Sequence, residues 1–80
     1  MSTTDIVLEE LAKIAGTDEI RQNLDIPLFD EQILDSLGVL ELIVSLGDIF
    51  QIELTPATVD RKLWATPRKI ISDIETRLNH

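Results

Sequence analysis

Ser36 is the residue of this chain that is best placed to carry chemistry. It lies in the run 34–38, Leu-Asp-Ser-Leu-Gly, at the head of a long apolar stretch. This run does not fit the G-x-S-x-G turn of a serine hydrolase, because Leu34 stands where that turn needs glycine. The sequence holds no cysteine, and its single histidine, His80, is the terminal residue. We therefore expect no catalysis by this chain alone, since it offers neither a thiol nucleophile nor a positioned base.

Ligand-binding patterns of other kinds are missing from the sequence. The sequence contains neither the phosphate-binding pattern G-x-x-x-x-G-K-[ST] nor the dinucleotide-binding pattern G-x-G-x-x-G. It also lacks the acidic pattern of a calcium-binding loop. Structural zinc sites need clustered cysteine and histidine, which the composition does not supply. We expect no metal site.

Ser36 has two possible roles at the start of a helix that we predict from Ser36 to about Gln51. Serine is a common N-cap, and its hydroxyl could do no more than accept a backbone hydrogen bond. Alternatively, a phosphodiester attached there would be stabilised by the unpaired N–H groups and the dipole of the helix. An arm ending in a thiol would then supply the thioester chemistry that a chain without cysteine lacks. The four residues 35–38 leave both roles open.

This predicted helix carries more apolar residues than one core-facing stripe can hold. The stripe we assign to the core comprises Val39, Leu42, Ile43, Leu46, Ile49 and Phe50. A second stripe comprises Leu37, Leu40 and Val44, with Asp35, Glu41 and Asp48 around it. These three residues either pack beneath segment 17–35 or form an apolar docking patch with a charged rim, as partner surfaces commonly do.

Two further main helices follow from spacing and capping signals. Val7, Leu11 and Ile14 recur at helical intervals over residues 4–15, with Thr4 or Asp5 as the cap and Gly16 as the stop. A last helix begins with Thr66 as N-cap and Pro67 in the first turn, and runs to about Leu78. Its expected inward residues are Ile70 or Ile71, Ile74 and Leu78.

The connections add shorter elements. Residues 18–24 could form a short helical turn, and residues 58–63 could form a short helix. Residues 52–54 alternate like a strand but have no partner run. The apolar residues of the long first connection should lie over the core: Leu28, Phe29, Ile33 and Leu34. The fold class we predict is all-α, a single domain over residues 1–80 with three main helices, one short helix and a long loop between the first two main helices.

Charge is distributed unevenly along the 80 residues. Residues 1–60 hold 13 acidic and 2 basic residues, a net charge of −11, and residues 61–80 hold 5 basic and 2 acidic ones, which brings the total to −8. Such an acidic body disfavours binding to nucleic acid and to anionic lipid. Its acidic residues either form a solubilising surface or attract proteins with basic patches. No secretory signal or apolar run of membrane-spanning length is present. We expect a cytoplasmic monomer that does not insert into membranes.

At this point the residues resemble a known family. Asp35-Ser36-Leu37 opening a helix rich in leucine, isoleucine and valine, after a long apolar-studded loop, resembles the acyl carrier protein superfamily. The segment 60–70, with the pattern D-R-x-x-W-x-T-P-x-x-I, resembles the corresponding segment of D-alanyl carrier proteins. Gly38 and the pair Leu28-Phe29 also suit that branch.

The resemblance implies an acyl-carrier-like bundle and a mechanism. A phosphopantetheinyl transferase would attach 4′-phosphopantetheine to Ser36, with Asp35 near the magnesium ion that serves the transfer. A D-alanine ligase that uses ATP would load D-alanine as a thioester, and a membrane acyltransferase would receive it for D-alanylation of lipoteichoic acid in cell wall biogenesis. Docking of these enzymes would involve Leu37, Leu40, Glu41, Val44 and Asp48.

Two alternatives remain beside this hypothesis. The chain could be a fatty-acyl or an aminoacyl or peptidyl carrier, which uses the same arm for another cargo. It could instead be a non-catalytic helical interaction domain in which Ser36 is only a cap. In either case we expect Trp64 to fill the end of the bundle and Arg61 to pair with a nearby carboxylate.

Overall fold

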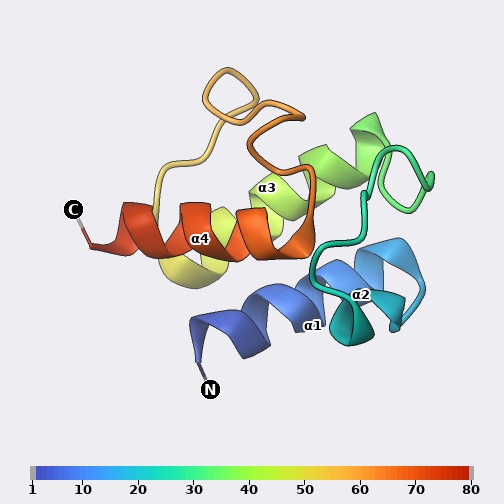
Figure 1. The fold of residues 1–80 in the computed structure, drawn as a ribbon. Helices are drawn as coiled ribbons and strands as arrows, with labels where there is room; N and C mark the ends of the chain where they lie inside the picture. Colours follow the sequence, from blue (N-terminus) through green and yellow to red (C-terminus); the bar gives the residue numbers. More distant parts are fainter. Residues whose placement is uncertain (1, 80) are drawn as a thin grey trace.

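The computed structural model describes residues 2–79, which form four helices. They are α1 (Thr3–Ala15), α2 (Glu19–Gln22), α3 (Ser36–Phe50) and α4 (Pro67–Leu78). Helix α1 packs against both α3 and α4, and long connections precede and follow α3 (Figure 1). This arrangement confirms the predicted all-α class with three main helices, and its one short helix is α2, in the segment 18–24 where a helical turn was expected. The terminal residues Met1 and His80 lie outside the described part of the chain, and so does the expectation that His80 has no catalytic role.

The first helix begins earlier than predicted, at a different cap. The backbone N–H of Asp5 donates to Ser2 Oγ at 3.1 Å, so Ser2 is the N-cap and the assignment to Thr4 or Asp5 was wrong. The end of α1 is as predicted: Gly16 adopts the left-handed conformation with φ 72°, and its N–H donates to Ala12 O. Glycine enters this conformation without the steric penalty of a Cβ atom.

Helix α4 has both of the predicted start signals. Thr66 is the N-cap, with its hydroxyl accepting from the backbone N–H of Lys69 at 3.2 Å, and Pro67 occupies the first turn. Proline is tolerated there because its missing N–H would have no partner inside the helix. These signals place the start of α4 correctly.

The predicted short helix over residues 58–63 is wrong, since this segment consists of turns. Thr58 Oγ1 donates to Thr55 O at 3.1 Å, and Asp60 Oδ1 accepts from the backbone N–H of Leu63 at 2.7 Å. Short polar side chains that bond to the neighbouring backbone in this way compete with helix formation. Residues 52–54 likewise form no strand within the described chain.

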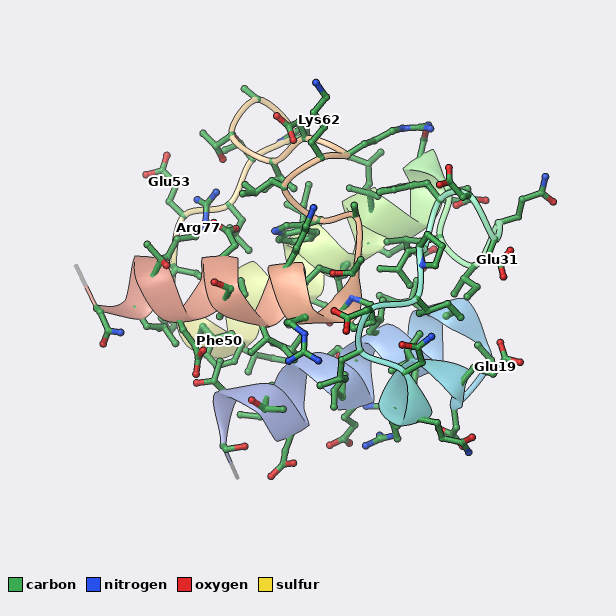
Figure 2. The ribbon with its side chains drawn as sticks, in the orientation of Figure 1. Glu19, Glu31, Phe50, Glu53, Lys62 and Arg77 are labelled. Atoms are coloured by element: carbon green, nitrogen blue, oxygen red, sulfur yellow. The ribbon has the colours of Figure 1, made fainter. Side chains whose placement is uncertain are left out.

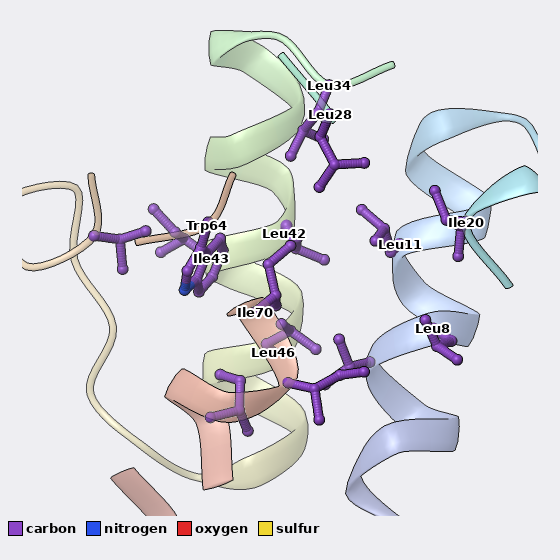
Figure 3. Close-up of a cluster of buried hydrophobic side chains, with 14 of the residues drawn as sticks. Leu8, Leu11, Ile20, Leu28, Leu34, Leu42, Ile43, Leu46, Trp64 and Ile70 are labelled. Atoms are coloured by element: carbon purple, nitrogen blue, oxygen red, sulfur yellow. The ribbon is translucent and has the colours of Figure 1, made fainter. Parts of the chain in front are cut away.

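One aliphatic core joins the helices around Leu42 and Leu46 of α3, both fully buried (Figure 3). Leu11 of α1 faces them from one side and Ile70 of α4 from another. Val39 and Phe50 pack at the edge of this core. Two assignments to the core were wrong: Ile49 is 44% exposed and Leu78, at the end of α4, is 38% exposed.

The connection between α2 and α3 lies over the core, as its apolar content predicted. Leu28 is fully buried and Leu34 is 2% exposed. The backbone N–H of Leu28 donates to Ala65 O at 2.9 Å, and the N–H of Arg68 donates to Leu24 O at 2.9 Å. These bonds fasten the first connection to the segment before α4, so that residues distant in sequence meet beside the start of α3.

No helix in the described residues has both the length and the apolar content needed to cross a membrane.

Candidate functional site

Ser36 is the first residue of α3, and the cap of that helix is its neighbour. Asp35 has an extended backbone, and its Oδ1 accepts from the backbone N–H of Gly38 at 2.8 Å. Asp35 is therefore the N-cap, and the interpretation of Ser36 as a capping serine is wrong. The Ser36 side chain is exposed at the N-terminus of a 15-residue helix. Its hydroxyl has no capping duty and is accessible to a modifying enzyme.

Gly38 seats the first turn of α3 against the preceding connection. A Cβ atom at this position would come within 2.8 Å of Leu34 Cδ1, closer than real carbon contacts. Because Leu34 is buried in the core, its side chain could not move away without disturbing the packing. Glycine thus lets the loop and the helix approach closely, which fixes the position of Ser36.

Arg61 reaches Ser36 from the connection between α3 and α4. Its Nη2 donates to Ser36 Oγ at 3.1 Å, and its guanidinium carbon lies 5.0 Å from the centroid of the Phe29 ring. The expected pairing of Arg61 with a carboxylate is wrong for the described residues, where no such ion pair forms. Sequence reasoning missed this contact, because no local pattern links positions 29, 36 and 61.

A shallow hollow of about 400 Å³ opens directly beside Ser36. Its lining is largely apolar and joins residues of α3 to residues of the connection that carries Asp60 and Arg61. The lining residues are Ser36, Val39, Leu40, Ile43, Pro56, Val59, Asp60 and Arg61. A flexible group attached to Ser36 would therefore begin next to an apolar groove.

The second apolar stripe of α3 is exposed along its length. Leu37 is 65% exposed, Leu40 45% and Val44 71%, so these residues do not pack beneath the first connection. Glu41 and Asp48 are exposed beside them. A hollow lies along this stripe, and Ile49 and Glu10 of α1 also line it. Its other lining residues are Leu40, Glu41, Val44, Ser45 and Asp48.

Glu10 joins α1 to α3 at the rim of this surface. Ser45 Oγ donates to Glu10 Oε1 at 2.6 Å, and Lys13 Nζ donates to Glu10 Oε2 at 3.1 Å. The hydrogen bond from Ser45, with the one from Lys13, lowers the pKa of Glu10 below its ordinary value. The carboxylate therefore stays ionised and keeps the two helices linked at neutral pH.

Trp64 is fully buried, as expected, and fills the space between α3 and α4 (Figure 3). Its Nε1 donates to Asp73 Oδ2 at 2.9 Å, and Arg77 Nε donates to the same oxygen at 2.9 Å. Arg77 Nη2 in turn donates to Thr58 O at 3.0 Å. This network holds the connection that carries Arg61 against α4, and it accounts for Trp64 as a structural residue.

Comparison with known proteins gives consistent relatives over nearly the whole chain. The family model described as "Phosphopantetheine attachment site" matches residues 5–74, which include Ser36. The D-alanyl carrier protein of Lacticaseibacillus rhamnosus is 41% identical over 69 residues, 86% of this chain and 85% of its own. The D-alanyl carrier protein of Enterococcus faecalis is 40% identical over 75 residues, 94% of this chain and 96% of its own. The same protein of Listeria monocytogenes is also 40% identical over 75 residues.

The chain belongs to the D-alanyl carrier protein family. As a member it is a carrier protein rather than an enzyme, and its cofactor is covalently attached 4′-phosphopantetheine. The geometry around Ser36 fits a D-alanyl carrier protein, because an exposed hydroxyl stands at a helix N-terminus with a guanidinium beside it. Both features favour the phosphodiester through which such an arm is attached.

Proposed function

We propose that this protein carries D-alanine as a thioester on a 4′-phosphopantetheine arm attached to Ser36. The observation that carries the proposal is the exposed, non-capping serine at the head of α3 in a chain about 40% identical to D-alanyl carrier proteins. Ser36 lies in the matched region, and its hydroxyl stands at a helix N-terminus fixed by Asp35 and Gly38. When attached, the arm supplies a terminal thiol, which the chain otherwise lacks because it contains no cysteine.

The attachment step uses the Ser36 hydroxyl as the nucleophile. Ser36 Oγ attacks the phosphorus that bears the pantetheine arm of coenzyme A, and a new O–P bond forms. The bond from that phosphorus to the oxygen of the nucleotide breaks, adenosine 3′,5′-bisphosphate leaves, and the hydroxyl proton passes to a base of the phosphopantetheinyl transferase. We assign Asp35 a place near the magnesium ion of that complex, since it neighbours Ser36 and only its Oδ1 is engaged in the hydrogen bonds of the described residues.

Loading and delivery would then require two further partners. An ATP-dependent ligase activates D-alanine as its adenylate, and the thiol displaces AMP to form the thioester. A membrane acyltransferase receives the D-alanyl group for transfer toward lipoteichoic acid. Loading requires ATP, and we therefore place the protein in the cytoplasm, where ATP is made available to the ligase.

The exposed row on α3 is the surface we assign to these partners. Leu37, Leu40 and Val44 form its apolar centre, with Glu41 and Asp48 as its acidic rim. The row starts next to Ser36, so an enzyme bound to it has the arm within reach. A small contact of this kind suits a carrier that must leave one enzyme for the next, because small interfaces are typically transient.

The test of the cargo is transfer of labelled amino acid to the loaded protein. The arm-bearing chain is incubated with ATP, magnesium, the ligase and either D-alanine or L-alanine, and label that stays with the protein is measured before and after hydroxylamine treatment. We expect D-alanine to be retained and then released as the thioester is cleaved, with Ser36→Ala unlabelled. No retention of D-alanine on fully loaded protein, or retention of L-alanine in its place, would contradict the proposal.

A further inference from the structure

Arg61 differs from the other three arginines of the chain in what it contacts. Arg21, Arg68 and Arg77 pair with aspartates at 3.3, 2.8 and 2.9 Å respectively. Within residues 2–79, the guanidinium of Arg61 forms no ion pair and instead donates to Ser36 Oγ at 3.1 Å. Arg61 therefore has no carboxylate within ion-pair distance among these residues, and its guanidinium donates to one serine.

Phe29 holds this guanidinium in place from a distant part of the chain. The Arg61 guanidinium carbon lies 5.0 Å from the centre of the Phe29 ring, a distance at which the cation is attracted to the aromatic face. Phe29 belongs to the connection between α2 and α3. The backbone hydrogen bond from Leu28 N–H to Ala65 O joins this connection to the segment before α4. Stacking on a ring leaves the edge of the planar guanidinium available for hydrogen bonds. The direction of Arg61 is therefore set by the fold.

Positive charge is otherwise scarce around Ser36. The sequence contains no lysine or arginine between Arg21 and Arg61, so neither α3 nor the connection before it supplies a cation. Asp35 precedes Ser36 directly, and Glu41 lies on the same helix. A phosphodiester on Ser36 would add negative charge to a region that is already acidic, and Arg61 is the cation the structure places in contact with it.

We propose that Arg61 is the positioning residue for the phosphodiester of the attached arm. The inference rests on the proposed function, that is, on attachment at Ser36. Once the phosphate is joined to Ser36 Oγ, the Arg61 N–H that now donates to the hydroxyl donates to a phosphate oxygen. A hydrogen bond between two charged groups is shorter and stronger than the one it replaces. Arg61 also lines the groove beside Ser36, so this bond holds the root of the arm at the mouth of that groove.

The first experiment needs no variant and uses nuclear magnetic resonance of the arginine side chains. The guanidinium signals of ¹⁵N-labelled protein are compared before and after the arm is attached, with complete attachment verified by intact mass. We expect the Arg61 signals to shift and those of Arg21, Arg68 and Arg77 to stay, since these three are held by aspartates. Arg61 signals that stay in place on fully loaded protein would overturn the proposal.

The second experiment measures the coupling between Arg61 and the arm through stability. Unfolding in urea is followed for the protein with and without the arm, in the wild type, in Arg61→Gln and in the control Lys62→Gln. Lys62→Gln removes one positive charge from the adjacent position, and the Lys62 side chain points away from the molecule (Figure 2). At low salt we expect the arm to raise the unfolding equilibrium constant about two- to fivefold more in Arg61→Gln than in the wild type, the range of exposed ion pairs.

The outcomes separate this proposal from the one on which it rests. A matching effect in Lys62→Gln, or none in Arg61→Gln, would show that Arg61 acts only through net charge or not at all, and would overturn its positioning role while attachment at Ser36 stands. A wild type that gains no arm overturns the proposed function itself. The expected effect should also shrink in 0.5 M salt, because screening weakens exposed charge pairs.

Discussion

At the scale of single residues, Asp35 and Ser36 have different roles, and their substitutions should therefore affect stability differently. Asp35 caps α3, whereas the Ser36 hydroxyl satisfies no backbone group of the helix. We expect Asp35→Ala to lower the free energy of unfolding by about 1 kcal/mol, the usual cost of a lost N-cap. Ser36→Ala should change it by less than about 0.5 kcal/mol, as exposed substitutions do. Urea denaturation of both variants without the arm measures this, and a larger loss in Ser36→Ala would contradict the assignment of the cap.

Trp64 gives a second prediction at this scale. The fully buried indole packs in the core and donates to Asp73, so Trp64→Ala leaves a cavity and removes a hydrogen-bond donor. We expect the free energy of unfolding to fall by about 3–5 kcal/mol. In a chain of this size the melting temperature should drop by more than about 10 °C. Leu63→Ala is the matched control, because Leu63 is adjacent to Trp64 in sequence and its side chain is 38% exposed. Similar small shifts in both variants would show that Trp64 is not a core residue.

At the scale of elements, the hydrogen bond from Ser45 of α3 to Glu10 of α1 joins the two helices, and its contribution to stability depends on pH. The pKa of Glu10 is lowered in the folded state by the hydrogen bond from Ser45 and then by Lys13. A lowered folded-state pKa contributes stability above the unfolded-state value, about 4.3, and that contribution is lost as the pH falls through the folded-state value. The link should therefore be at full strength at pH 7 and disappear in acid.

Ser45→Ala tests this link directly. We expect the variant to raise the pKa of Glu10 toward its ordinary value and to lose stability at pH 7 more than in acid. The pKa is followed by the carboxyl carbon resonance of Glu10 during titration. Ser72→Ala, an exposed serine on α4, is the control and should leave the pKa of Glu10 unchanged. An unchanged pKa in Ser45→Ala would show that this hydrogen bond does not form in solution.

The sequence predicted those elements whose ends carry strong local signals. Gly16, Thr66 and Pro67 mark helix ends through their own backbone preferences, and all three are found in those roles. The start of α1 was misplaced because Ser2, Thr3, Thr4 and Asp5 are all competent caps, and local preference does not choose among them. The helix over 58–63 failed because the Thr58 and Asp60 side chains bond to the backbone nearby.

Long-range contacts account for what the sequence could not predict at the site. Helical periodicity placed Leu37, Leu40 and Val44 on one face, but whether the first connection covers them depends on tertiary packing. Ile49 was assigned to the core on the same periodicity, but it is 44% exposed and lines the hollow beside Glu10. The contact of Arg61 with Ser36 spans 25 positions, and pattern reasoning has no access to such pairs.

At the scale of the whole molecule, the exposed row on α3 should separate docking from folding. Leu40 is 45% exposed, so Leu40→Asp is expected to leave the melting temperature almost unchanged while it weakens binding to the ligase. Because Leu40 lies at the apolar centre of the row, we expect its loss to cost more than about 1 kcal/mol of binding, roughly a fivefold rise in Kd, as central interface residues can. Titration calorimetry with the ligase measures this change.

Leu42→Asp is the opposite control for that row. Leu42 is fully buried two residues further along the same helix, so the variant places a charge in the core and should unfold the protein. Unfolding of Leu40→Asp as well would remove Leu40 from the docking surface. Unchanged ligase affinity in a folded Leu40→Asp would place the docking surface elsewhere.

The central claim is that Ser36 receives the arm, and intact mass measures this most directly. The protein is incubated with coenzyme A, magnesium and a broad-specificity phosphopantetheinyl transferase, with Ser36→Ala in parallel. The account predicts that the wild type gains the mass of one phosphopantetheine and that Ser36→Ala, folded to the same extent, gains none. An unchanged mass of the folded wild type, or a gain that persists in Ser36→Ala, would contradict attachment at Ser36.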